Sequence, residues 1–256
     1  MKKPEHKATA GGKGGSMVLP GMRICGLGLF LEKSKTLALS DFHLGYEEML
    51  NRSGVFVPRT NFAAIKKHLS EKVFSKCKPE RIIILGDLKH EFGVISKQEW
   101  REVFEMLEFL SGHCKEIVLL RGNHDKILAP IAEWKNLSIL ENGFYSEEDK
   151  ALFLHGDKIV RSADFEQAET VVIGHEHPAV SIREGVKNEQ FKCFLKGGFD
   201  GKNLVVLPSL NQLNIGTDLS REKTLSPFLK RGLGDFEVWA VEDKAYYFGK
   251  LSGLEE

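Results

Sequence analysis

The sequence lacks a hydrophobic run long enough to cross a bilayer, which takes about 20 consecutive apolar residues. It begins Met1-Lys2-Lys3, but no apolar segment of the kind found in a secretory signal follows. We therefore expect a protein with no membrane partner, located in the cytoplasm.

Cysteine is scarce and has no paired spacing. The four cysteines are far apart and form no Cys-x-x-Cys pair: Cys25, Cys77, Cys114 and Cys193. That spacing argues against a disulfide framework and against a structural zinc site built on thiolates. We expect buried or half-buried free thiols in a reducing compartment.

The chain also lacks net charge. Lysine plus arginine and aspartate plus glutamate number 36 each, so the formal charge is zero. A neutral chain has no global attraction to nucleic acid or anionic lipid, although it can carry a local basic patch. Hydrophobic residues make up 42% of the 256 residues, which is enough for a substantial core.

The first residues differ in composition from the rest. Residues 1–16 are polar, basic and glycine-rich, and such a segment buries too little apolar area to fold. We predict a disordered tail over residues 1–20, or a leader ahead of Met17, and a single domain over residues 21–256. The GGKGG stretch in this tail lacks both the spacing of a phosphate-binding loop and the strand that precedes one.

Short apolar segments alternate with amphipathic ones from about residue 23. Strands are predicted at 23–31, 36–40, 81–85, 116–120, 151–154 and 170–173, and helices at 60–76 and 97–111. The second helix has one apolar stripe made by Trp100, Val103, Phe104, Leu107 and Leu110. After residue 178 further strands are expected at 179–183, 191–195, 204–207, 236–241 and 245–248, around a long polar connection over 211–232.

Five of the apolar strands lead into polar motifs. In chain order these read DFH, GDLKH, RGNHD, LHGD and GHEH. Loops at the carboxyl ends of strands in an α/β sheet are where ligands gather, so we predict one site built from all five. One DxH pair arises easily by chance, whereas an ordered set of five does not. The candidate residues are Asp41, His43, Asp87, Asn123, His124, Asp125, His155, Asp157, His175 and His177.

These side chains offer oxygen and imidazole nitrogen and no thiolate. Such a set suits Mn, Fe, Zn, Ni or Mg better than a soft metal. Two ions about 3.5–4 Å apart can polarise one phosphoryl group and lower the pKa of a bridging water, which then attacks phosphorus in line. The residue types alone do not assign a ligand to either ion.

In type and order, the five motifs resemble those of the calcineurin-like metallophosphoesterases. The chain from about 23 to 250 is similar to the smaller members related to the SbcD nuclease and to the DNA-ligase-associated phosphoesterases. The features shared with that subgroup are GDLKHEFG and, nearer the C-terminus, LPSLN, SPFLK and FGKL. The resemblance implies an α/β fold of two facing mixed β-sheets flanked by helices, with the site at the strand ends on one edge.

The resemblance also implies a role for each candidate. It places three residues on a first metal ion, three on a second and one between them: Asp41, His43 and His177; Asn123, His155 and His175; and Asp87. His124 would contact the phosphoryl group and protonate the leaving oxygen, and Asp125 would orient His124. The implied cofactors are two divalent ions, with Mn²⁺ expected first and Fe, Zn, Ni or Mg as alternatives.

Several residues also have a purely structural interpretation. Asp41 could cap a helix over 46–51, because Asp is a favoured cap. His155 could be a hydrogen-bonded core residue. His90 is expected beside the site rather than among the ligands, and Arg121 is a candidate for reaching phosphate or an acidic ligand. The aromatic residues after 190 could stack on nucleic-acid bases, although filling a second sheet's core is the simpler interpretation.

The expected activity is hydrolysis of a phosphodiester, of nucleotide or nucleic-acid type, with DNA repair proteins as the partners that the subgroup suggests. One alternative is a double-strand-break nuclease working with an ATPase, but such nucleases carry an added DNA-capping domain. A phosphomonoesterase or pyrophosphatase acting on a small metabolite is a second. A third is a metal-binding scaffold in a DNA repair complex, against which the His124–Asp125 pair argues, because a scaffold needs no acid.

Overall fold

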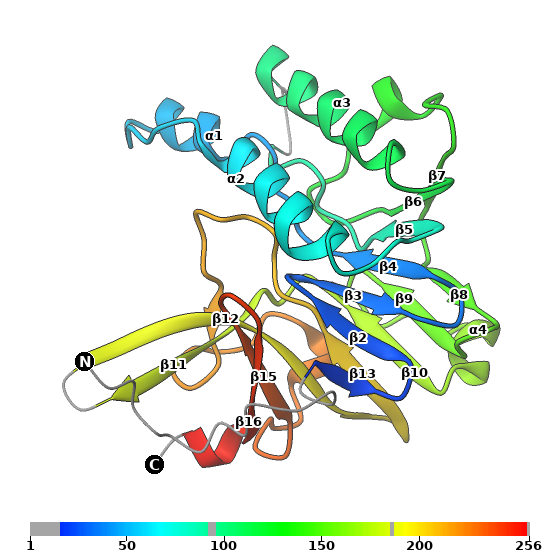
Figure 1. Cartoon of the computed structure of the whole chain (residues 1–256), viewed down its shortest axis with the longest axis vertical. Helices are drawn as coiled ribbons and strands as arrows, with labels where there is room; N and C mark the ends of the chain where they lie inside the picture. The colour runs from blue at the N-terminus through cyan, green and yellow to red at the C-terminus, as the bar shows by residue number, and fades with distance from the viewer. Residues whose placement is uncertain (1–15, 92–95, 185–186, 255–256) are drawn as a thin grey trace.

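Two β-sheets lie face to face in the computed structural model, which describes residues 16–91, 96–184 and 187–254 (Figure 1). Three helices lie together over the first sheet, and a short one lies beside the second. These helices are α1 (Tyr46–Arg52), α2 (Asn61–His68), α3 (Lys97–Ser111) and α4 (Ala163–Gln167). None of the helices in the described ranges is long and apolar enough to cross a membrane.

The first sheet has seven strands that pair in chain order: β1 (Met17–Leu19), β2 (Met22–Cys25), β3 (Gly28–Leu31), β4 (Thr36–Leu39), β5 (Arg81–Ile84), β6 (Glu116–Leu120) and β7 (Leu137–Leu140). Strands β1 to β4 are antiparallel, and β4 to β7 are parallel. Every residue of β3 and β4 is buried, as expected for strands covered on both faces. The parallel arrangement brings the carboxyl ends of β4, β5 and β6 to the same edge.

The second sheet has nine strands and mixed pairing. Seven follow the order β14 (Thr217–Asp218), β11 (Pro178–Glu184), β12 (Lys187–Phe199), β13 (Lys202–Val206), β10 (Thr170–Ile173), β9 (Ala151–Leu154) and β8 (Phe144–Ser146). Strand β15 (Glu237–Val241) pairs with β12 and with β16 (Ala245–Lys250). Because β9, β10 and β13 are mutually parallel, their carboxyl ends also meet at one edge.

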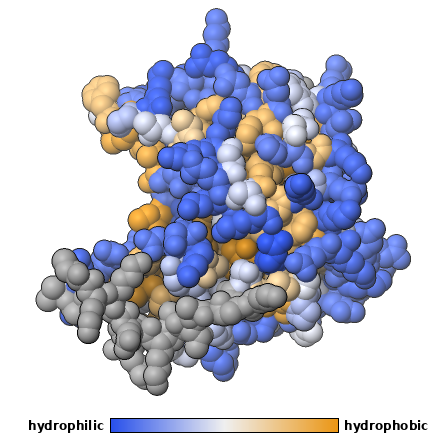
Figure 2. Space-filling view, in the orientation of Figure 1, coloured by the Kyte–Doolittle hydropathy of each residue, from blue (hydrophilic) through white to orange (hydrophobic). Residues whose placement is uncertain are grey.

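Apolar side chains fill both faces of the second sheet. One cluster joins the two sheets and extends beneath α2 and α3, with Phe153, Phe194 and Trp239 contributed by the second sheet. The other lies on the outer face of that sheet against α4 and the 3₁₀ helix η3 (Pro227–Leu229). Phe194 and Trp239 are therefore core residues and not a base-stacking surface. On the face in Figure 2 hydrophilic residues dominate, and apolar ones show as separate patches among them.

Two predictions near the N-terminus need correction. The single strand predicted over 23–31 is wrong, because Gly26 has φ +57° and turns the chain between β2 and β3. The predicted tail over 1–20 is wrong for Met17–Leu19, which pair as β1 with β2; residues 1–15 lie outside the described residues. The other predicted strands are present, with shifted ends in several cases, and α3 has the predicted bounds.

Candidate metal centre

The five motifs meet where the carboxyl ends of strands from the two sheets face each other. Strands β4, β5 and β6 of the first sheet lead to Asp41, Asp87 and Asn123, while β9 and β10 of the second lead to His155 and His175. The sheets are linked through these residues: His155 Nδ1 lies 2.7 Å from the Leu85 carbonyl oxygen, and the His175 amide donates to Asp41 Oδ2 at 2.9 Å. Residues from all five motifs thus meet at one place between the two sheets.

The backbone at this site adopts an unfavourable conformation. Nine described residues other than glycine have positive φ, and five of them are predicted ligands: Asp41 at 51°, His43 at 46°, Asp87 at 50°, His175 at 65° and His177 at 51°. L-residues with side chains rarely occupy this region, and strain of this kind persists at functional sites where the surroundings impose it. At these five positions the chain bends sharply, and the side chains of separate loops converge there.

The ligand atoms fall into two groups, each with its candidate atoms within 4.8 Å of one another: Asp41, His43 and His177, and Asp87, His155 and His175. In the first, His177 Nε2 lies 3.3 Å from His43 Nε2 and 3.4 Å from Asp41 Oδ1. In the second, Asp87 Oδ2 lies 3.6 Å from His155 Nε2. The same Asp87 oxygen lies 3.8 Å from His43 Nε2, so it is near both groups.

The first group fits a divalent cation. Asp41 Oδ1 is buried and has no hydrogen-bond partner among the described residues, an arrangement that costs free energy unless something else binds the oxygen. Two nitrogens bound to a tetrahedral ion at 2.0–2.1 Å lie about 3.3 Å apart, which is the spacing between His43 and His177. The donor set therefore matches a metal ion better than it matches a closed hydrogen-bond network.

Electrostatics also favour a cation. Burial, followed by the carboxylates of Asp41 and Asp125, raises the pKa of Asp87 to about 9. Burial lowers the pKa of His43 well below 6.5 and that of His175 to about 4. The rings of His43 and His175 are thus neutral, as a metal ligand must be, while Asp87 retains a proton that a divalent cation would displace.

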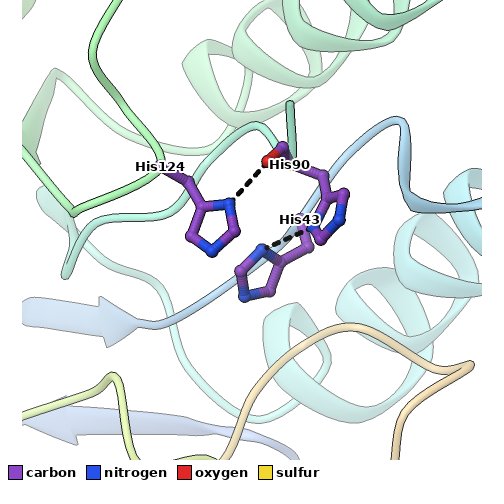
Figure 3. A group of neighbouring side chains, drawn as sticks. All are labelled: His43, His90 and His124. Carbon is purple, nitrogen blue, oxygen red and sulfur yellow. Dashed lines mark hydrogen bonds between the residues drawn. The ribbon is translucent and has the colours of Figure 1, made fainter. Parts of the chain in front are cut away.

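His124 lies beside these groups with its ring held by a main-chain acceptor. Its Nδ1–H donates to the carbonyl oxygen of His90 at 2.5 Å (Figure 3). Its amide donates to Asp87 Oδ1 at 2.9 Å. Burial lowers the pKa of His124, whereas the bond to the His90 carbonyl raises it. Donation from Nδ1 leaves Nε2 as the ring nitrogen that can face a substrate.

The expected contact between Asp125 and the His124 ring is corrected by this geometry. The carboxylate of Asp125 accepts instead from the amides of Gly122 at 3.1 Å and of Leu88 and Lys89 at 3.4 Å. Asp125 therefore ties the loop after β6 to the loop after β5.

His90 lies beside the predicted ligands. Its Nδ1 is 3.3 Å from Nδ1 of His43, and its ring stacks on that of His124 with 5.0 Å between the ring centroids (Figure 3). The His90 ring also lies edge-on to Tyr46, with 4.8 Å between the ring centroids. Together His43, His90 and His124 form a third group of potential ligand atoms. The candidate Arg121 instead forms an ion pair with Glu141 at 2.8 Å.

The helix-cap interpretation of Asp41 is excluded, because α1 begins after Gly45. The Asp41 carbonyl accepts from Ser209 Oγ at 2.7 Å, a contact from the LPSLN segment that follows β13. The pattern of strand ends could have indicated Ser209, since β13 runs parallel to β10 and its carboxyl end reaches the same edge.

Three further charged residues next to the site were missed. Glu176 is buried between His175 and His177, and its Oε2 accepts from the amides of Leu225 at 2.8 Å and Ser226 at 2.7 Å. The polar connection over 211–232 is thereby fixed to the site loop. Lys89 and Glu99 are also buried, and no spacing rule singles them out from the many surface lysines and glutamates.

Replacing Gly174 with alanine is expected to damage the site through packing. A Cβ there would lie 1.8 Å from Ser40 Oγ and 2.8 Å from Asp41 Oδ2, and Ser40 already donates to that oxygen at 2.5 Å. We expect a loss of about 1–3 kcal/mol in unfolding free energy and weaker metal binding. Denaturant unfolding and metal titration measure both effects, with Gly253→Ala as the control, since nothing lies within 4 Å of a Cβ there. Unchanged stability and metal affinity would show that the Ser40–Asp41 contact can shift freely.

Comparison with known proteins identifies a family and a similar fold. The sequence profile described as "Calcineurin-like phosphoesterase" matches residues 34–231. The fold is similar to nuclease MPE of Pseudomonas putida, with a TM-score of 0.60, 16% identity and coverage of 89% of this chain and 94% of the nuclease. No curated protein sequence matches the chain.

Two further solved structures align less well. YfcE, a phosphoesterase from E. coli, gives a TM-score of 0.38 at 14% identity, over 79% of this chain and 86% of that one. Vacuolar protein sorting 29 from Cryptosporidium parvum gives 0.37 at 15% identity, over 84% and 97%. The predicted fold of two facing mixed sheets with flanking helices is confirmed by the structure and by its similarity to nuclease MPE.

Proposed function

The chain belongs to the calcineurin-like phosphoesterase family, and we propose that it hydrolyses a phosphodiester of nucleotide or nucleic-acid type with two divalent ions. Members of that family are metal-dependent phosphoesterases. The observation that carries the two-ion proposal is the position of Asp87, whose Oδ2 lies 3.8 Å from His43 Nε2 and 3.6 Å from His155 Nε2. One carboxylate near two separate ligand groups is suited to bridge two ions.

In this proposal the ligands follow the two groups, with Asn123 added to the second and Asp87 shared between both. Asp41, His43 and His177 hold one ion; Asn123, His155 and His175 hold the other; and Asp87 contacts both. Asn123 is supported by its Oδ1, which lies 2.9 Å from His155 Nε2. Mn²⁺ is the first choice, with Fe, Zn, Ni or Mg as alternatives, because all suit oxygen and imidazole donors. When bound, such ions polarise the phosphoryl group and activate water for attack.

The protein's own contribution centres on His124. With Nδ1 donating to the His90 carbonyl, a protonated His124 presents Nε2–H toward the space beside the ligand groups. Its Nε2 lies 4.0 Å from Asp87 Oδ2, so a phosphoryl group bound beside the ligand groups would be within reach of His124. His124 then gives its proton to the oxygen that leaves phosphorus, and Asp125 acts as a positioning residue through the two loops that it joins.

The preference for a diester is supported by the resemblance of the GDLKHEFG and LPSLN segments to the SbcD-related subgroup. That subgroup also suggests DNA repair proteins as partners. A single domain over 21–256 is supported by the core cluster shared between the sheets. Cytoplasmic location stays a prediction, supported by four free cysteines.

A comparison of two model substrates tests the diester proposal. Metal-stripped protein reloaded with Mn²⁺ is expected to hydrolyse bis(p-nitrophenyl) phosphate with at least about tenfold higher kcat/KM than p-nitrophenyl phosphate, about 1.4 kcal/mol of transition-state preference. The p-nitrophenolate release is followed by absorbance. Unreloaded protein is the control and should be inactive. A preference for the monoester would indicate a phosphomonoesterase instead. Turnover without metal would contradict the proposal that the reaction needs divalent ions.

A further inference from the structure

We propose that Lys89 and Glu99 are positioning residues that hold His124 in the orientation from which it protonates the leaving oxygen. The inference rests on the proposed function. Neither residue is a candidate ligand, and Glu99 lies on α3, outside all five motifs. The two act on different parts of His124, Lys89 on its main chain and Glu99 on the acceptor of its ring.

Lys89 acts on the main chain of His124. The residue is only 1% exposed, and its Nζ donates to the carbonyl oxygens of His124 and, at 2.5 Å, of Glu91. An ammonium group also bridges the loop after β5 to the loop after β6 in this way. Because the His124 amide is bound to Asp87 as well, both main-chain polar groups of His124 are fixed.

Glu99 acts on the ring of His124 through His90. Its Oε1 accepts from the amides of His90 at 3.1 Å and Glu91 at 2.9 Å. These bonds set the direction of the His90–Glu91 segment, and the carbonyl of His90 is the acceptor for His124 Nδ1–H at 2.5 Å. Glu99 is itself held by the start of α3, where Ser96 Oγ accepts from its amide at 3.0 Å.

The charges explain why a lysine can be buried here. Burial lowers the pKa of Lys89, whereas the neighbouring carboxyl groups of Asp125 and Glu99 raise it and favour the charged ammonium. A buried charge is costly unless it is paired and hydrogen-bonded, and an apolar side chain at 89 would avoid that cost. An apolar residue at position 89 could not donate a hydrogen bond to the His124 carbonyl, and this is the bond to which we assign the function of Lys89.

The test compares two esters of thymidylate whose leaving groups differ in basicity. The phenyl ester expels a more basic oxygen than the p-nitrophenyl ester, so it depends more on a proton donor. Lys89→Met should reduce kcat on the phenyl ester by about 10- to 100-fold and on the p-nitrophenyl ester by less than about threefold. Metal content should equal that of the wild-type protein. Lys196→Met is the control for losing a partly buried lysine, because it breaks the 2.6 Å ion pair between Lys196 on β12 and Glu237 on β15.

Glu99 provides a second series in case Lys89→Met does not fold. Glu99→Leu removes the acceptor for both amides and should reproduce the leaving-group dependence, whereas Glu99→Gln retains an Oε1 acceptor and should restore turnover. In NMR spectra of metal-free protein, the Nδ1–H signal of His124 should be lost or exchange-broadened in Glu99→Leu and retained in Glu99→Gln.

The outcomes separate this inference from the proposed function. If His124→Ala slows the two esters equally, the proton-donor role itself fails. If His124→Ala shows the leaving-group dependence but Lys89→Met and Glu99→Leu slow both esters equally, or not at all, the positioning role is overturned and the donor role stands.

Discussion

Replacing Asp87 with asparagine is expected to abolish turnover and to release most of the bound metal. Asp87 Oδ2 lies near His43 Nε2 and His155 Nε2, so one substitution removes an anionic ligand from both groups. An amide oxygen carries no net charge, and metal-ion stabilisation of a phosphoryl transition state amounts to several kcal/mol. We expect a fall in kcat/KM on the order of 1,000-fold or more, measured with saturating Mn²⁺, and fewer than two ions per chain by elemental analysis.

In the metal-free protein, the same variant should make stability less sensitive to rising pH. Burial and the neighbouring carboxylates of Asp41 and Asp125 raise the pKa of Asp87 to about 9, against 3.8 for the ordinary group. The folded state therefore holds a proton that the unfolded state has released between these pH values, and stability falls as pH rises through that window. Asparagine does not titrate. Between pH 5 and about 9, the melting temperature of metal-free Asp87→Asn should therefore fall by less than that of the wild-type protein.

A surface aspartate provides the matched control. Asp243→Asn lies in the turn between β15 and β16, where the carboxylate accepts from Tyr246 Oη at 2.7 Å. This variant should leave metal content and turnover unchanged. If Asp87→Asn retained two ions and wild-type turnover, the proposed bridging role of Asp87 would be wrong.

The strand ends were predictable because strand periodicity and ligand chemistry coincide in the sequence. The apolar run before each motif fixes a buried strand, and parallel pairing brings the ends of β4, β5 and β6 together without further information. The unfavourable backbone at Asp41 and Asp87 was not predictable, since positive φ in residues with side chains follows from the tertiary surroundings.

What sequence reasoning missed depends on contacts between distant segments. Lys89 and Glu99 look like ordinary charged residues, and only the fold places the first against His124 and the second against His90. The prediction that Asp125 contacts the His124 ring was wrong for the same reason. The Asp125 carboxylate accepts from the amides of Gly122 and Leu88 instead. A family role carried over by position identifies the residue and not its hydrogen-bond partner.

Replacing His124 with alanine is expected to separate catalysis from metal binding. His124 belongs to neither of the two groups that contain an aspartate, and alanine retains the amide that donates to Asp87 Oδ1. We therefore expect an unchanged metal content and a fall in kcat of about 100- to 10,000-fold on a basic leaving group, the range that a positioned proton donor contributes. The p-nitrophenyl ester of thymidylate should be affected less than the phenyl ester.

Metal counting in His124→Ala also decides what the three histidines of Figure 3 do. His43, His90 and His124 could together hold an ion, and His124 would then be a ligand instead of an acid. The hydrogen bond from His124 Nδ1 to the His90 carbonyl commits that nitrogen, so Nε2 alone is available for either role. Loss of one ion per chain in His124→Ala, but not in the distant variant His113→Ala, would establish the third metal position and overturn the proton-donor assignment.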